Sequence, residues 1–182
     1  MHPLLDQVSF WVALTMLGSA AITDFRTGLI PNAIVSCGGV AGVLVQLLAA
    51  GFGRASVVAT LASMGLGLSA CSIVPGVLYA AGALGGGDLK LLAALGLCVG
   101  PVVGLDIQLC AYLWAAAWLP LYFLCHAGAR RALRTSGVLV LNAFLPIERR
   151  AKVDRAQLTS MRFAPAIFAA AVWVGWFGGV LP

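Results

Sequence analysis

The sequence predicts an all-α, polytopic membrane bundle of about six transmembrane helices, with both chain termini on the outer face. The 182 residues have a mean hydropathy of +1.02, and only 9% of them are charged. Soluble globular domains carry about 25% charged residues. Apolar stretches of about 20 residues, the length of a helix that crosses a bilayer, recur along the whole chain. These spans and their loops account for residues 1–182 as one integral-membrane domain.

Six apolar segments define the expected helices in chain order. They cover residues 4–22, 31–50, 56–84, 88 to about 101–104, 106–127 and 163–181. The chain start lacks the basic region of a cleavable signal peptide, so we expect the first segment to be a retained helix. The third segment is long, and we expect Pro75 and Gly76 to kink it. Trp173 and Trp176 in the last segment suit an outer interfacial belt.

The basic residues set the expected orientation, because loops rich in Lys and Arg stay on the cytoplasmic side. The hydrophilic segment 128–162 holds eight of the eleven Lys and Arg residues, so we expect it to be a cytoplasmic loop. Counting helices back from this loop, the turns after the first and third helices also face the cytoplasm. Those turns carry Asp24 with Arg26 and Asp88 with Lys90. The sequence therefore predicts that Asp24 and Asp88 lie at the same membrane face.

Within the basic loop, residues 137–146 form an apolar stretch that is too short to span a bilayer. We expect this stretch to lie in the interface or to re-enter the membrane. We interpret its basic flanks as contacts with anionic lipid headgroups in preference to contacts with a substrate. Nucleic-acid binding is not expected, because the charge sits on a short membrane loop rather than on a basic domain.

Each aspartate has a structural explanation besides a functional one. Asp88 follows three glycines, so it could cap the helix that it begins. Asp24 precedes Pro31 and Asn32 in a segment that could form a turn before the next helix. Carboxylates at the ends of apolar helices are nevertheless expensive, and these two are the acids expected at the cytoplasmic ends of spans. Taken together, they favour a joint site.

Two carboxyl groups held close together share a proton over part of the pH range, because both cannot readily ionise. One then acts as a base on a bound water, and the other acts as an acid toward a peptide carbonyl. Gly85 and Gly87 suit this chemistry, since a peptide backbone can approach closely where side chains are missing. Arg26 and Lys90 could bias ionisation, but we favour their simpler role as markers of the cytoplasmic boundary.

The strings around both aspartates resemble a known family. Residues 85–88 form the Gly-x-Gly-Asp motif of the GxGD membrane aspartic proteases. Residues 24–32 (DFRTGLIPN) and 85–96 (GGGDLKLLAALG) look like the corresponding strings of the type IV prepilin leader peptidases, and residues 162–166 (RFAPA) resemble the proline-bearing start of their last helix. The resemblance spans nearly the whole chain. It implies an aspartic endopeptidase in which Asp24 and Asp88 are the catalytic pair.

The resemblance also implies a substrate and a location. Such an enzyme removes a short, basic leader from a pilin precursor at the cytoplasmic face of the bacterial inner membrane. Larger, bifunctional members carry a cytoplasmic domain with paired Cys-x-x-Cys motifs and also N-methylate the trimmed pilin. This chain has neither, and it looks like the short, peptidase-only form associated with Flp pili of tight-adherence systems. We therefore expect no N-methyltransferase activity, no S-adenosylmethionine binding and no cofactor.

Other functions stay open at the level of the residues. A presenilin-like or signal-peptide-peptidase-like GxGD protease would cut within the bilayer, but those enzymes have a tyrosine where this chain has Thr23. A small transporter, or a non-enzymatic assembly factor of a pilus or secretion system, would also contain buried acids. No span carries the polar stripe that transport would favour. The five cysteines stand singly, without the pairs typical of zinc sites, so no metal site is expected.

Overall fold

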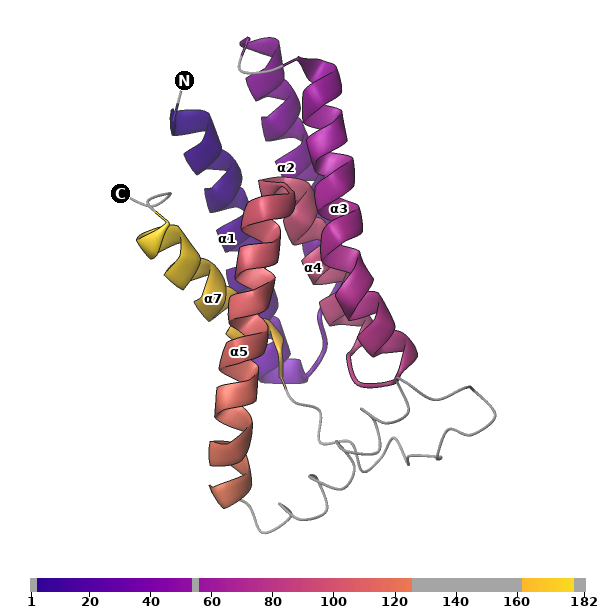
Figure 1. Cartoon of the computed structure of the whole chain (residues 1–182), viewed down its shortest axis with the longest axis vertical. Coiled ribbons are helices and arrows are strands. Elements are labelled where there is room, and N and C mark those ends of the chain that lie inside the picture. Colours follow the sequence, from indigo (N-terminus) through magenta and orange to yellow (C-terminus); the bar gives the residue numbers. More distant parts are fainter. Residues whose placement is uncertain (1–2, 54–55, 126–161, 179–182) are drawn as a thin grey trace.

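The computed structural model describes residues 3–53, 56–125 and 162–178, and every regular element in these ranges is an α-helix. The helices are α1 (Pro3–Thr27), α2 (Asn32–Gly51), α3 (Val57–Ala80), α4 (Gly86–Val99), α5 (Pro101–Cys125) and α7 (Ala164–Phe177). They run alternately down and up, so that α1 begins and α7 ends toward the same end of the bundle (Figure 1). The predicted all-helical bundle is confirmed.

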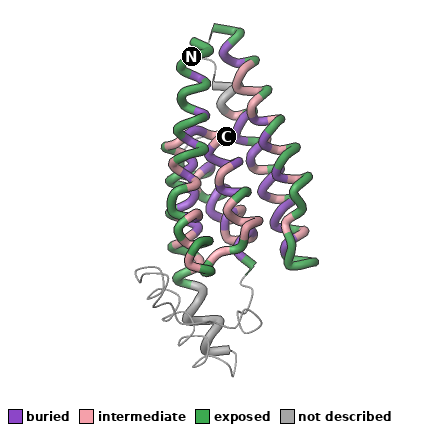
Figure 2. Tube along the Cα trace, turned by 90° about the vertical axis from the view of Figure 1, so that its right-hand side faces the viewer, coloured by how far each residue is buried: buried purple, intermediate pink, exposed green. Residues whose placement is uncertain are grey.

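The outward faces of the helices are apolar, as a bilayer requires. The segment Gln7–Thr27 of α1, together with α2 and α3, is long and apolar enough to cross a membrane, and α5 and α7 contain shorter apolar stretches. Figure 2 shows exposed positions along the outside of the helices and buried positions between them. The exposed positions include large apolar side chains such as Val58, Leu66 and Ile73 of α3. A helix of a water-soluble bundle would carry polar residues there, so the fold is that of a helical membrane protein.

The central helix is α4, which packs against α1, α2, α3 and α5. Its side chains Leu91, Leu92 and Leu95 are completely buried. With 14 residues, α4 is about 21 Å long, shorter than the roughly 30 Å of the hydrocarbon core. Gly100 then reverses the chain with a φ of 81°, and Pro101 begins α5. α4 therefore starts at one end of the bundle and stops inside it (Figure 1).

Glycine contacts bring the neighbouring helices close to α4. A Cβ atom added to Gly67 of α3 would overlap the carbonyl oxygen of Gly96 of α4, and a Cβ added to Gly96 would overlap the carbonyl oxygen of Gly67. A Cβ added to Gly42 of α2 would overlap the sulfur of Cys98 in α4. Small residues at helix crossings let membrane helices approach closely. These glycines therefore fix the position of α4 between α2 and α3.

Several helix boundaries differ from the sequence prediction. α1 continues past the expected end at residue 22 to Thr27, because Gly28, with a φ of 69°, is the first residue that leaves the helix. α3 ends at Ala80 rather than at residue 84. α5 begins at Pro101 rather than at residue 106, since proline is well tolerated at the first position of a helix. Asp24 consequently lies in the last turn of α1 and not in the connection that follows.

The predicted cytoplasmic loop of residues 128–162 lies outside the described residues except for Arg162, and so does the apolar stretch 137–146. The orientation derived from this loop stays a prediction.

We expect Gly67→Ala to lower the stability of the bundle, because the added methyl group would overlap the backbone of Gly96. Overpacking of this kind costs about 1–3 kcal/mol, which should appear as a lower midpoint of thermal unfolding in detergent. The matched control is Gly65→Ala on the same helix, where an added Cβ meets nothing within 4 Å. Alanine is the better helix former, so this variant should be at least as stable as the parent. Equal midpoints for the two variants would contradict the packing described for α3 and α4.

Candidate active site

Asp24 lies in the last turn of α1 and faces the beginning of α7. Its side chain is only 6% exposed. One carboxylate oxygen accepts a hydrogen bond from the backbone N–H of Ala164, the first residue of α7. The first N–H groups of a helix have no partner within the helix. The side chain of Phe163, the N-cap residue of α7, makes no capping hydrogen bond to them. Asp24 therefore supplies from a neighbouring helix the cap that α7 lacks.

Arg162 makes the opposite contact, from the chain just before α7 to the end of α1. Its guanidinium group donates a hydrogen bond to the carbonyl oxygen of Phe25 and lies 5.3 Å from the centre of the Phe25 ring. The last carbonyl groups of a helix also lack partners within it. The charge of Arg162 interacts favourably with that of Asp24. We call the two contacts, Asp24 with Ala164 and Arg162 with Phe25, the reciprocal cap.

Asp88 lies in the first turn of α4, where Gly85 is the N-cap residue. Its carboxylate accepts a hydrogen bond from the backbone N–H of Gly85. An acidic side chain at the third helical position that reaches back to the N-cap N–H forms half of a capping box. Asp88 thus helps to cap α4, as expected. It does so from the third residue of the helix rather than from its beginning.

The glycines before Asp88 are needed for space. A Cβ atom at Gly85 would lie 3.0 Å from a carboxylate oxygen of Asp88, and a Cβ at Gly87 would lie 3.1 Å from the Cβ of Ile30. Neither glycine has a positive φ among the described residues. Their role here is therefore close packing of the connection between α1 and α2 against the start of α4, with no demand on the backbone conformation.

The structure brings Asp24 and Asp88 together at one end of the bundle, where α1 ends and α4 begins (Figure 1). The carboxyl groups are close enough for their charges to repel each other. One oxygen of each, Oδ2 of Asp24 and Oδ1 of Asp88, is buried and has no hydrogen-bond partner among the described residues. Carboxyl groups with this arrangement can take up and release a proton in concert, and each has an oxygen free to bind a water or a substrate group.

Lys90 and Arg26 contact neither carboxylate through a hydrogen bond in the described part of the chain. The Nζ of Lys90 donates to the Oδ1 of Asn32, 3.0 Å away, and so joins α4, two residues beyond Asp88, to the first residue of α2. Arg26 is exposed in the last turn of α1, where a positive charge complements the helix dipole. Lys90 thus positions the helix that carries Asp88.

Two polar residues near the aspartates were missed by the reasoning from sequence. Gln108 and Tyr112 lie one turn apart on α5, and the Nε2 of Gln108 donates to the hydroxyl oxygen of Tyr112, 3.2 Å away. The ring of Tyr112 stacks on Phe163, with 5.5 Å between the ring centres. The available signal was a glutamine inside an apolar helix, which is costly in a membrane.

Metal binding finds no support in the described ranges. No group of three His, Cys, Asp or Glu side chains in these ranges could hold an ion. The four cysteines whose side chains are described, Cys37, Cys71, Cys98 and Cys110, are free thiols.

Comparison with known protein families gives a match over residues 11–128 to the model of the type IV leader peptidase family. The match covers more than half of the chain and includes both aspartates, and the chain belongs to this family. Comparisons with curated proteins and with solved structures gave no match. The protein is therefore a membrane peptidase of the leader peptidase type.

We expect Gly87→Ala to reduce peptidase activity about tenfold or more, because the new Cβ would press on Ile30 and displace the first turn of α4. Displacements of about 1 Å can cost a hundredfold in rate. The measurement is the rate of substrate cleavage by purified protein in detergent or lipid. Ile30→Gly removes the Cβ that the new methyl group would meet, so the double variant Gly87→Ala with Ile30→Gly should recover most of the lost activity. Failure of this rescue would show that Gly87 is needed for a reason other than space.

Proposed function

We propose that this member of the type IV leader peptidase family is an aspartic endopeptidase that removes the leader from Flp-like type IV pilin precursors. In this proposal Asp24 and Asp88 form the catalytic dyad, and cleavage takes place at the cytoplasmic face of the bacterial inner membrane. The observation that carries the proposal is the meeting of two carboxyl groups from separate helices, each with a buried and unpartnered oxygen.

The surroundings of the two carboxyl groups suggest different roles for them. Asp24 has the N–H of Ala164 and the positive charge of Arg162 to stabilise a carboxylate. Asp88 accepts from Gly85 but faces the charge of Asp24. We therefore assign the base to Asp24 and the acid to Asp88.

The reaction then proceeds in two stages. Asp24 takes a proton from water while the water oxygen bonds to the peptide carbonyl carbon, and Asp88 gives its proton to the carbonyl oxygen. In the tetrahedral intermediate that results, Asp24 passes the proton to the peptide nitrogen and the C–N bond breaks. One of the two hydroxyl groups on the carbon then returns its proton to Asp88, and the other stays in the new carboxyl group. Both aspartates regain their starting states.

The level of the dyad favours a cut at the membrane edge over a cut within the bilayer. Asp24 lies in the last turn of α1 and Asp88 in the first turn of α4, so each is within one turn of a helix end. A presenilin-like enzyme that cuts inside a transmembrane segment would need its acids deeper along the helices. A transporter would also be expected to hold such acids near the midplane. The position of both aspartates at helix ends therefore supports cleavage of a leader at the membrane edge.

The substrate side of the proposal rests on the family and on the resemblance to its short form. Residues that read the leader would lie near the dyad, and the exposed Arg26 and Lys90 carry charges of the same sign as a basic leader. They are therefore better placed to hold the protein at the membrane surface and to position α4 than to bind the leader directly. S-adenosylmethionine and N-methylation have no part in the proposal.

We expect Asp24→Asn and Asp88→Asn each to lower precursor cleavage by at least about a hundredfold, since asparagine cannot exchange the proton. The structure makes these substitutions mild, because an asparagine oxygen can still accept the N–H of Ala164 or of Gly85. The assay is the conversion of a co-expressed pilin precursor, followed by its shift in mass. Asp106→Asn, which alters an exposed acid on α5, is the matched control and should cleave at the parental rate. Parental activity in either dyad variant, with correct membrane insertion, would disprove the proposed function.

The position of the cut offers a separate test. We expect the scissile bond to lie within about one helical turn, roughly 5 Å, of the cytoplasmic edge of the precursor's apolar segment. Mass spectrometry of both products locates the bond. A cut deep inside the apolar segment would instead support a presenilin-like protease.

A further inference from the structure

Gln108 and Tyr112 form a polar pair inside an otherwise apolar helix. Residues four apart lie on the same face of a helix, and the face that carries this pair is turned into the bundle. Gln108 is only 2% exposed. Its amide nitrogen donates to the Tyr112 hydroxyl oxygen, while its Oε1 is buried and has no partner among the described residues. A buried polar group without a partner costs about 1–3 kcal/mol, so packing alone would favour an apolar residue at this position.

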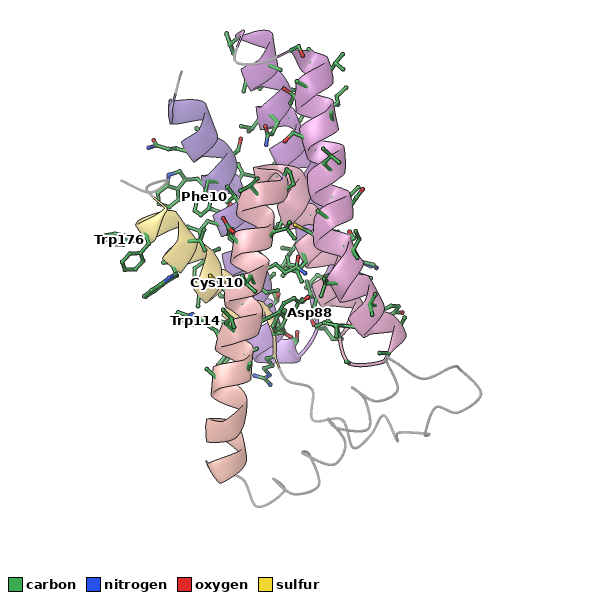
Figure 3. All side chains as sticks on the ribbon, in the orientation of Figure 1. Phe10, Asp88, Cys110, Trp114 and Trp176 are labelled. Carbon is green, nitrogen blue, oxygen red and sulfur yellow. The ribbon has the colours of Figure 1, made fainter. Side chains whose placement is uncertain are left out.

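Tyr112 is connected to both halves of the dyad. Its ring stacks on Phe163, which directly precedes the Ala164 whose N–H binds Asp24. Its hydroxyl group is close enough to Asp88 for the two to interact electrostatically. In the view of Figure 3, Asp88 and Trp114 are labelled on opposite sides of the α5 ribbon. Tyr112 is therefore linked to Asp24 through Phe163 and Ala164, and to Asp88 through electrostatics.

The hydrogen bond from Gln108 determines what Tyr112 can do. A phenol has one O–H donor as well as acceptor capacity on its oxygen. Because the Gln108 amide donates to that oxygen, the hydroxyl hydrogen is directed away from Gln108 and can be given to another acceptor. The Oδ1 of Asp88 and the Oδ2 of Asp24 are free acceptors, and a peptide carbonyl placed between them would be a third.

We infer that Tyr112 is a further catalytic residue of this site and that Gln108 is its positioning residue. The inference rests on the proposed function. The Tyr112 hydroxyl donates a hydrogen bond to the carbonyl oxygen of the scissile peptide bond. It stabilises the partial negative charge that this oxygen carries in the transition state, before the proton of Asp88 is fully transferred. Tyr112 keeps its proton throughout, so the proton transfers remain those between the two aspartates, water and substrate. A hydrogen-bond donor placed where negative charge develops lowers the activation barrier, because it stabilises the transition state more than the bound substrate.

The test compares Tyr112→Phe and Gln108→Leu with the parent in cleavage of a pilin precursor by the full-length protein in lipid. Phenylalanine keeps the ring that stacks on Phe163, so the fold is preserved while the donor is lost. Loss of one oxyanion donor typically lowers kcat by about a hundredfold, and we expect that fall for Tyr112→Phe with KM unchanged within about twofold. Gln108→Leu should lower kcat about tenfold. The double variant should be no slower than Tyr112→Phe alone, because both substitutions remove the same interaction.

The matched control is Tyr79→Phe, which removes a hydroxyl group from an exposed tyrosine of α3 and should leave kcat and KM at parental values. A parental kcat for Tyr112→Phe would overturn the inference. So would independent, multiplying effects of the two substitutions, or an effect on KM alone.

The dyad variants separate this inference from the proposed function. Inactive Asp24→Asn and Asp88→Asn proteins together with a fully active Tyr112→Phe protein would refute only the role of Tyr112. Active dyad variants would refute both. If Tyr112→Phe inserts poorly, Gln108→Leu decides the question, since it leaves the tyrosine in place, and a parental kcat in that variant overturns the inference.

Discussion

The reciprocal cap is the contact on which the rest of the site depends. Helix ends expose N–H and C=O groups that lack partners, and an unsatisfied group is expensive where water is scarce. Here each helix end receives a partner from the other segment: Asp24 accepts from the N–H of Ala164, and Arg162 donates to the carbonyl group of Phe25. One of the four groups involved is the carboxylate assigned as the base. The hydrogen bond between Asp24 and Ala164 therefore both stabilises this end of the bundle and orients one carboxyl group of the proposed dyad.

The two aspartates are held in different ways. Asp88 is fixed by its own helix, through the N–H of Gly85 and through a helix position set by glycine contacts with α2 and α3. The hydrogen bond between Lys90 and Asn32 attaches α4 to α2 close to Asp88. Asp24 depends instead on a partner helix far away in the sequence. In the proposed dyad, Asp88 thus belongs to the buried central helix α4, whereas the position of Asp24 depends on the contact between α1 and α7.

Sequence reasoning reached the helices and the aspartates because both leave local signals. Apolar runs of membrane-spanning length placed six helices, and counting them placed Asp24 and Asp88 at one end without any knowledge of the fold. The end of α1 was placed too early, because polar residues such as Thr23 and Asp24 were taken to end the helix. They continue it instead, since Thr23 and Thr27 return hydrogen bonds to carbonyl groups one turn earlier.

Pairings between distant segments could not be predicted in this way. The contacts of Ala164 with Asp24 and of Tyr112 with Phe163 depend on how α5 and α7 sit beside α1, and neighbouring residues do not encode that arrangement. Arg162 was counted as one of many basic residues in a loop, although its effect here is that of a C-terminal cap for α1. Gln108 gave a signal by its polarity, but its partner could be named only once α5 was seen in place.

The long separation along the chain between the partners of the reciprocal cap bears on how the protein is made. Arg162 and Phe25 are 137 residues apart, and α7 is the last of the described helices. During synthesis α1 enters the membrane with Asp24 still lacking its backbone donor, and α4 brings Asp88 beside it before that donor exists. The proposed catalytic centre is consequently completed by α7, the last of the described helices to be synthesised. A chain that ended before α7 would contain both aspartates but would lack Ala164 and Arg162, the two residues that stabilise the carboxylate of Asp24.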